Sequence, residues 1–251
     1  MEKANNAIVK VPEVTLAFWI IKIAATTLGE TGGDAVSMSM NLGYLIGTII
    51  FAAVFLVAVV AQMRSERFSP ALYWVTIIAT TTVGTTLADF VDRSLGIGYA
   101  GGSALLVFLL LTSLFIWYRA MGSVSVTTVS SSKAEVFYWV TIMFSQTLGT
   151  ALGDWTADTA GLGYSGAALI FGGLLLALVI AYYATEIPRT LLFWAAFILT
   201  RPLGAVVGDF LDKPIANGGL AMSRYNASIA LVAFILVCGS VFRQRPAEAS
   251  H

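Results

Sequence analysis

Four pairs of carboxylates stand in sequence that is otherwise apolar, and they are the residues best suited to chemistry. The members of each pair are three or four positions apart, and the pairs are Glu30 with Asp34, Asp89 with Asp92, Asp154 with Asp158, and Asp209 with Asp212. Residues at this spacing lie on one face of a helix. Each pair therefore predicts a helix that presents two carboxylates in the same direction.

The residues around these pairs restrict the chemistry that the carboxylates support. The other nearby donors are hydroxyls and amides, such as Thr85, Thr150 and Gln146. Oxygen ligands alone suit hard cations, so we expect Mn²⁺, Mg²⁺ or Ca²⁺ as the ligand or substrate, with the eight carboxylates as metal ligands or proton carriers. The chain has one cysteine, Cys238, and its only histidine is the last residue. We therefore expect no zinc site, no covalently bound cofactor and no enzymatic activity that uses cysteine or histidine.

Eight carboxylates close together would repel one another and would need compensating charge. Bound cations or bound protons could supply it, and so could Lys22 and Arg201, which lie inside apolar runs. Buried charges need partners, so we expect these two residues to form ion pairs with neighbouring carboxylates. In a second interpretation the acids lie in water at helix ends, because the repeated aspartate is about 22 Å along a helix from its tryptophan.

The carboxylate pairs belong to a unit that occurs four times. The copies align on Trp19, Trp74, Trp139 and Trp194, and each has an aromatic residue just before its tryptophan, a glycine ten residues after it and an aspartate fifteen residues after it. Small residues four positions apart precede each aspartate and favour close helix packing. The aromatic–tryptophan pairs predict anchors at a membrane interface. Repetition within one chain indicates a fold built from four similar units.

The composition indicates an integral membrane protein. Of the 251 residues, 58% are hydrophobic and only 11% are charged, whereas charged residues make up about 25% of a soluble domain. The formal net charge is zero. A nucleic-acid partner is therefore not expected, since it needs a concentrated basic surface. The expected partners are the lipid bilayer and a small inorganic cation, and the sequence leaves the oligomeric state open.

Each repeat contains two apolar runs long enough to cross about 30 Å of hydrocarbon. The eight runs are residues 14–35, 42–62, 71–91, 98–117, 135–156, 163–183, 190–211 and 223–241. We expect an all-α integral membrane protein with eight transmembrane helices. Because each repeat has an even number of spans, the four two-helix repeats are parallel about an axis normal to the bilayer. Packing the four first helices near that axis would bring the carboxylates together.

Spacing between the tryptophans divides the chain into two halves. The offsets are 55, 65 and 55 residues, and the additional ten residues fall in a stretch rich in serine and threonine. We expect repeats 1 and 2 in residues 1–120, a polar cytoplasmic linker in residues 121–134, and repeats 3 and 4 in residues 135–251.

Basic residues in the flanks of the apolar runs predict the orientation. One side carries Lys3, Lys10, Arg64, Arg67, Arg119, Lys133, Arg189, Arg243 and Arg245, and the other carries Arg93, Lys213 and Arg224. The richer side is expected to face the cytoplasm, which places both termini there. We expect a multi-pass protein of the bacterial inner membrane.

The repeated unit resembles a known family. Tandem units with an aromatic–tryptophan start, a TxG step, a GD pair and an LGY turn are similar to a repeat of unknown function in bacterial multi-spanning membrane proteins, over Phe18 to about Arg243. This resemblance implies the architecture and little about function. The fourth repeat departs most, with Pro202 at the hydroxyl position and Gly219 in place of the turn tyrosine. The GGD and LGD sequences also resemble intramembrane aspartyl proteases superficially, but the full protease motif is absent.

Together these features predict a membrane transporter of a hard cation, with a divalent ion such as Mn²⁺ preferred and with proton coupling as one mechanism. In an exchanger, cation binding would release protons from the carboxylates, and protonation from the other side would expel the cation. Two alternatives stay open. One is a pseudo-tetrameric cation channel, and the other is a membrane scaffold or sensor that transports nothing.

Overall fold

The computed structural model describes residues 9–247, and within them the fold is all-α. Lys3, one of the basic residues used to predict orientation, lies outside the described residues. The eight α-helices are α1 (Leu16–Asp34), α2 (Gly43–Arg64), α3 (Pro70–Asp89), α4 (Gly98–Met121), α5 (Ser132–Asp154), α6 (Gly163–Ala184), α7 (Arg189–Asp212) and α8 (Arg224–Val241). The only β-type pairing in this range is an isolated bridge between Pro12 and Pro246.

Polar N-cap residues precede three of these helices. Thr15, Ser69 and Ser131 each accept a hydrogen bond from a backbone N–H in the first turn of α1, α3 and α5. Pro70 follows at the first position of α3. A backbone N–H at this position has no partner within the helix, so a proline can stand there without the loss of a hydrogen bond. At the other end, α1, α3 and α5 each continue for five residues as a π-helical turn directly after the repeated aspartate.

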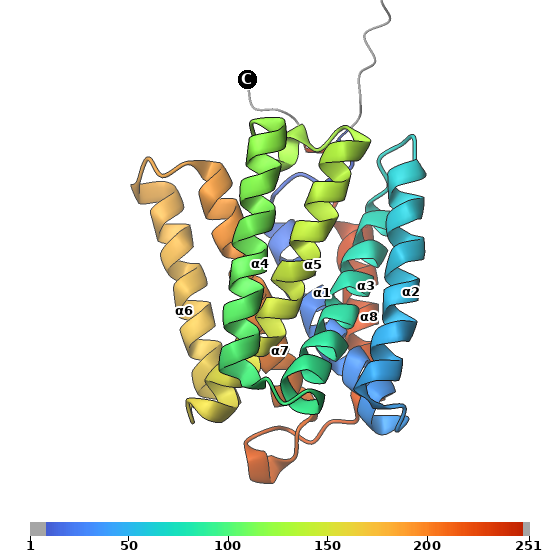
Figure 1. Ribbon diagram of the computed structural model, residues 1–251, viewed down its shortest axis with the longest axis vertical. Helices are drawn as coiled ribbons and strands as arrows, with labels where there is room; N and C mark the ends of the chain where they lie inside the picture. The colour runs from blue at the N-terminus through green and yellow to red at the C-terminus, as the bar shows by residue number, and fades with distance from the viewer. Residues whose placement is uncertain (1–8, 248–251) are drawn as a thin grey trace, which may run out of the picture.

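The first helices of the four repeats form an inner ring (Figure 1). In this ring α1 contacts α3, α3 contacts α5, α5 contacts α7, and α7 returns to α1. The second helices lie outside it, and each packs mainly on the first helix of the following repeat: α2 on α3, α4 on α5, α6 on α7, and α8 on α1. Each repeat therefore packs against the next one, and the contact of α8 with α1 closes the ring.

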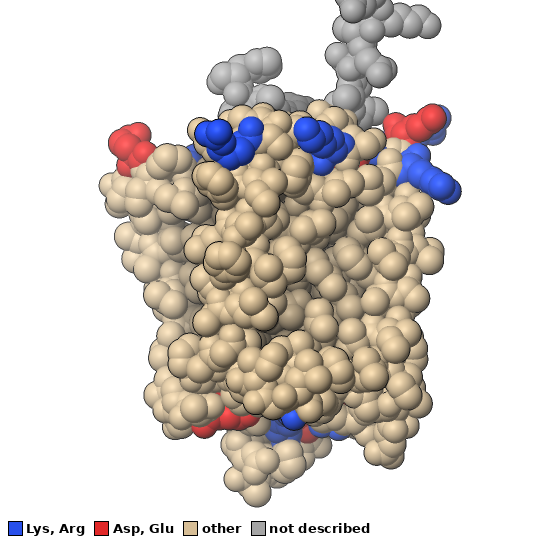
Figure 2. Space-filling view, viewed as in Figure 1, with Lys and Arg blue, Asp and Glu red and all other residues tan. Residues whose placement is uncertain are grey.

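Six of the helices in the described part of the chain are long and apolar enough to cross a membrane. They are α2, α3 with its π-helical turn, α4, α6, α7 and α8. The two inner helices α1 and α5 are outside this set. Figure 2 shows charged side chains gathered at the two ends of the molecule and a charge-free surface between them. Eight α-helices are present, as expected, and the chain is a multi-pass membrane protein. Eight transmembrane spans stay a prediction.

Most of the aromatic–tryptophan pairs do not lie where the sequence predicted, and only Trp19 is partly exposed. Tyr73 and Tyr138 are fully buried inside the ring, and Trp74, Trp139 and Trp194 are at least 95% buried between helices. Interfacial anchors would instead be exposed to lipid headgroups. The pairs pack against one another because they close one end of the inner ring, where the Tyr73 and Tyr138 hydroxyls share a hydrogen bond of 2.7 Å.

The segment between the two halves is partly built into this end. Val126 and Val129 are buried in the main hydrophobic cluster, and the Trp194 indole donates a hydrogen bond to the backbone oxygen of Val124 at 2.9 Å. The expected polar linker thus also packs against the inner ring.

Candidate functional site

Side chains at every fourth position of the inner helices point to the centre of the ring and form layers. Next to the aromatic layer lie Lys22, Ile77, Ile142 and Phe197; beyond them Thr26, Thr81, Gln146 and Arg201; and then Glu30, Thr85, Thr150 and Ala205. The last layer consists of the repeated aspartates Asp34, Asp89, Asp154 and Asp209, which are 1–3% exposed. The interior is therefore aromatic at one end and acidic at the other.

The repeated glycines make room for these layers. A Cβ added at Gly149 would overlap the side chain of Arg201, and the equivalent glycines meet Thr81, Gln146 and Thr26 in the same way. In each case the close neighbour comes from the first helix of the following repeat. The glycine spacing therefore serves close helix packing, as the sequence predicted.

Two basic residues that follow the repeated aspartates compensate the acidic layer. Arg93 binds Asp89 through Nε and Asp154 through Nη2, both at 2.9 Å. Lys213 binds Asp34 at 2.7 Å and Asp209 at 2.9 Å. Each basic residue thus joins the aspartate of its own repeat to the aspartate of the next.

Lys213 lies just beyond the end of α7, and neighbouring carboxylates stabilise its positive charge. Burial of the side chain opposes the charge, but the neighbouring carboxylates of Asp209 and Asp34 outweigh burial and raise the pKa of the ammonium above its ordinary value. Lys213 is therefore a permanent cation at neutral pH.

Sequence reasoning used Arg93 and Lys213 only for orientation and missed them as partners of the acids. The signal that could have found them is their position, four residues after the aspartate in repeats 2 and 4. The same position carries Met38 in repeat 1 and Asp158 in repeat 3.

Glu30 and Arg201 meet at the centre, one layer inside the aspartates. The Arg201 Nη2 atom lies 3.0 Å from Glu30 Oε2 and also donates hydrogen bonds to the hydroxyls of Thr85 and Thr150. One guanidinium therefore joins residues of the other three repeats. Its Nε and Nη1 atoms have no partner among the described residues.

Lys22 lies deeper and forms no ion pair within the described residues. Its ammonium donates a hydrogen bond to the Thr200 hydroxyl at 3.3 Å and lies 3.8 Å from the centre of the Phe197 ring. A cation–π contact of this kind partly replaces the lost hydration of a buried cation. Of Lys22 and Arg201, only Arg201 thus contacts a carboxylate.

The second carboxylates of repeats 2 and 3 turn away from the ring, whereas that of repeat 4 stays near it, with Asp212 Oδ1 3.9 Å from Lys213 Nζ. Asp92 lies against Gly102 of α4, Asp158 is exposed, and Asp212 pairs with Arg224 of α8 at 3.0 Å. In repeats 2 and 3 the second acid falls in the π-helical turn. A π turn has a wider i→i+5 repeat, so the side chain no longer shares the face of the aspartate before it.

Three of the predicted ligands come together as a group that could hold a metal ion. Glu30, Asp34 and Asp209 are all buried, and each offers a carboxylate oxygen within 4.8 Å of the other two. Asp34 Oδ1 and Asp154 Oδ1 are buried and accept no hydrogen bond from the described residues. The arrangement offers oxygen ligands of high negative charge, which suit a hard cation.

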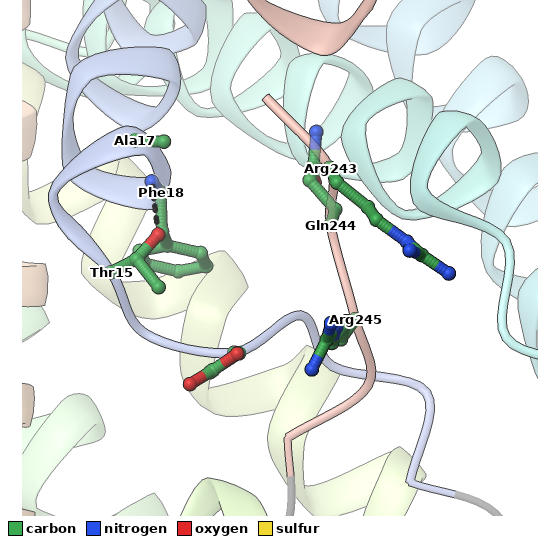
Figure 3. A pocket seen from close by; sticks show the side chains of 7 residues that line it. Thr15, Ala17, Phe18, Arg243, Gln244 and Arg245 are labelled. Atoms are coloured by element: carbon green, nitrogen blue, oxygen red, sulfur yellow. Dashed lines mark hydrogen bonds between the residues drawn. The ribbon is translucent and has the colours of Figure 1, made fainter. Parts of the chain in front are cut away.

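A small pocket near the termini is separate from this cluster. It lies where Thr15, Ala17 and Phe18 at the start of α1 face Arg243, Gln244 and Arg245 of the C-terminal segment (Figure 3). Phe18 belongs to the aromatic end of the ring, whereas Asp34 ends the same helix. This pocket is therefore at the opposite end of α1 from the acidic cluster.

The fold and the cluster define a multi-pass helical membrane protein built from a tandem repeat. Family comparison identifies the repeat: the model of the family described as Repeat of Unknown Function (DUF347) matches residues 17–68, 72–123, 137–187 and 192–244. The chain belongs to this family. No curated protein and no solved structure matches it.

Proposed function

We propose that this protein is a carrier of a hard cation, with a divalent ion such as Mn²⁺ as the preferred substrate. The observation that supports it is the buried group of Glu30, Asp34 and Asp209, whose carboxylate oxygens lie within 4.8 Å of one another. Buried carboxylates in a membrane protein are costly and usually mark an ion or proton pathway.

The packing of the interior favours a carrier over a channel. The aromatic end of the ring is closed by buried side chains, including Phe18, Tyr73 and Tyr138. The basic side chains of Lys22 and Arg201 also stand in the central layers and are fully buried. Passage of an ion would need rearrangement of these side chains, which is typical of a carrier.

In the proposed mechanism all eight helices span the inner membrane of a bacterium, and both termini face the cytoplasm. The basic flanks support this orientation. The acidic end then faces the opposite side and takes up or releases the ion there. Protons exchange with the cation at the carboxylates, so a pH gradient drives net movement.

Flux into proteoliposomes tests this function. Uptake of Mn²⁺, Mg²⁺, Ca²⁺, Na⁺ and K⁺ is measured with and without a pH gradient, for wild type, Asp34→Asn and Glu186→Gln. Glu186 is an exposed acid in the loop between α6 and α7, so its variant controls for loss of one charge. We expect divalent flux that responds to the gradient, survives Glu186→Gln and is abolished by Asp34→Asn.

Three results would contradict the proposal. Absence of flux for every ion would favour a sensor or scaffold, and rapid flux that ignores the pH gradient would favour a channel. Equal flux in Asp34→Asn and wild type would mean that the acidic cluster is not the transport site.

A further inference from the structure

The acidic layer contains two seams related by an approximate twofold repeat of the chain. The first seam lies between α7 and α1, where Lys213 joins Asp209 to Asp34. The second lies between α3 and α5, where Arg93 joins Asp89 to Asp154. The aspartates and the bridging cation therefore occupy equivalent positions in the two halves of the chain.

The two seams differ in one carboxylate. Glu30 lies four residues before Asp34 in the first seam, and the equivalent residue of the second seam is Thr150. Glu30 packs against Gly208 of α7, where an added Cβ would lie 2.7 Å from Glu30 Cβ. Only the first seam is found to form a group of three buried acids that could hold a metal among the described residues.

The bridging cations differ as well. Arg93 engages its two aspartates through two different nitrogens of its planar guanidinium and donates a hydrogen bond to Asp154 through Nη2. Lys213 engages both of its aspartates through one Nζ atom at the end of a flexible chain. An ammonium is a compact point charge that another cation can replace, whereas the arginine fork is a more specific partner.

We propose that the chain binds one divalent cation, at the α7–α1 seam, through Glu30, Asp34 and Asp209, and that this cation displaces the ammonium of Lys213. This inference rests on the proposed function and reduces the eight predicted ligands to three. Lys213 is then a tethered competitor that fills the site when no ion is bound. The α3–α5 seam is held closed by Arg93.

Charge and distance agree with this assignment. Three carboxylates face one deep guanidinium, Arg201, and the ammonium of Lys213. Arg224 also lies 3.7 Å from Asp34, but its charge is matched by Asp212 at 3.0 Å. A divalent ion in place of the ammonium, together with Arg201, balances the three negative charges. The three oxygens lie within 4.8 Å of one another, which is close enough for all three to bind one Mg²⁺ or Ca²⁺ at metal–oxygen distances of about 2.0–2.6 Å.

Access to the site is also present on the Lys213 side. The Lys213 side chain is 14% exposed and that of Asp34 is 1% exposed, while Arg93 at the other seam is 32% exposed, so both bridging cations reach water and exposure alone does not separate the seams. The loop after α7 folds back on itself, with Leu220 N–H bonded to Phe210 O at 2.8 Å and Ala221 N–H bonded to Lys213 O at 2.9 Å. This loop projects beyond the helices at the acidic end (Figure 1). Lys213 therefore lies between the buried aspartates and the water beyond the helix ends.

Manganese binding to the purified full chain in nanodiscs tests the proposal, with free Mn²⁺ followed by electron paramagnetic resonance. We expect one Mn²⁺ per chain. Asp34→Asn should weaken binding by about tenfold or more, because the charge of the ligand set controls affinity. Asp154→Asn, the matched change at the other seam, should weaken it by less than about threefold, since only the distant charge is lost.

Lys213→Met gives an independent readout, because removal of a competitor should tighten binding, by about tenfold for one displaced charge. It decides the question even if Asp34→Asn does not fold. Two ions per chain, equal losses in Asp34→Asn and Asp154→Asn, or unchanged or weaker binding in Lys213→Met would overturn the assignment. One bound ion without flux in proteoliposomes would support this site and contradict transport, whereas flux with equal losses at both seams would do the reverse.

Discussion

The inner and outer helices of this protein differ in burial and in the polarity of their side chains. Inner helix α3 is mostly buried, and it buries six threonines among its neighbours. Outer helix α6 is largely exposed, and it presents leucine and isoleucine side chains such as Leu169, Ile170 and Ile180. The inner helix therefore buries many polar side chains, and the outer helix exposes apolar ones, which is the reverse of the pattern in a soluble protein.

The difference shows where specificity resides. In a bilayer, lipid tails are as apolar as leucine, so association of helices relies on close packing and internal hydrogen bonds. The inner ring supplies both through its glycines and threonines. The outer helices need apolar character and length more than any particular shape, so substitutions in the two regions should have very different costs.

The largest effect is expected from filling the contact at a ring glycine. Gly149→Leu would drive its side chain into Arg201, whose backbone carbon would lie only 3.1 Å from the new Cβ. We expect no folded protein, measured as the loss of a monodisperse peak in size-exclusion chromatography. Gly173→Leu on α6 is the matched control, since no atom lies within 4 Å of a Cβ at that position. Equal yields of the two variants would contradict the distinction between inner and outer helices.

A smaller but still large effect is expected from Arg201→Leu. The change leaves Glu30 buried without its guanidinium, and breaking a buried ion pair on one side typically costs about 3–5 kcal/mol. Unfolding with SDS, followed by circular dichroism, would measure this loss in the free energy of unfolding. Adding Glu30→Gln to Arg201→Leu should recover a large part of it, because the unpaired charge is then removed. A double variant as unstable as Arg201→Leu would show that the guanidinium acts mainly through its threonine contacts.

The spacing of the repeats was sufficient to predict the helices and the gathering of the aspartates. Fifteen residues from tryptophan to aspartate is the same in all four copies, so the aspartates had to lie at one level once the first helices packed together. The family match and the eight helices confirm that repeat. The glycine positions likewise predicted the close approaches between inner helices.

Other features could not be predicted, because they arise from contacts between residues that are far apart in the sequence. The direction of Asp92 follows from the π-helical turn after Asp89 and from the space at Gly102 of the next helix. The packing of each second helix on the following repeat was also not predictable, because a short loop permits either neighbour. The burial of the aromatic–tryptophan pairs has the same origin, since ring closure places them between helices and away from the lipid headgroups.

The smallest effect is expected on the outer surface of α6. Leu169 is 78% exposed, and in a membrane its side chain contacts lipid whether the protein is folded or not. Leu169→Ala should therefore change the free energy of unfolding by less than about 0.5 kcal/mol, as for other surface substitutions. Leu148→Ala on α5 is the control, because Leu148 is 2% exposed and truncation of a buried leucine costs about 2–5 kcal/mol.

The same SDS titration in lipid–detergent mixed micelles measures both leucine variants. A loss at Leu169 as large as that at Leu148 would mean that another protein surface covers α6 in the membrane, since lipid alone does not distinguish a leucine from an alanine so strongly. Repeating the titration over a range of protein-to-lipid ratios would then separate the cases. A cost that disappears on dilution identifies a second copy of the chain on α6, and a cost that persists identifies packing within one chain.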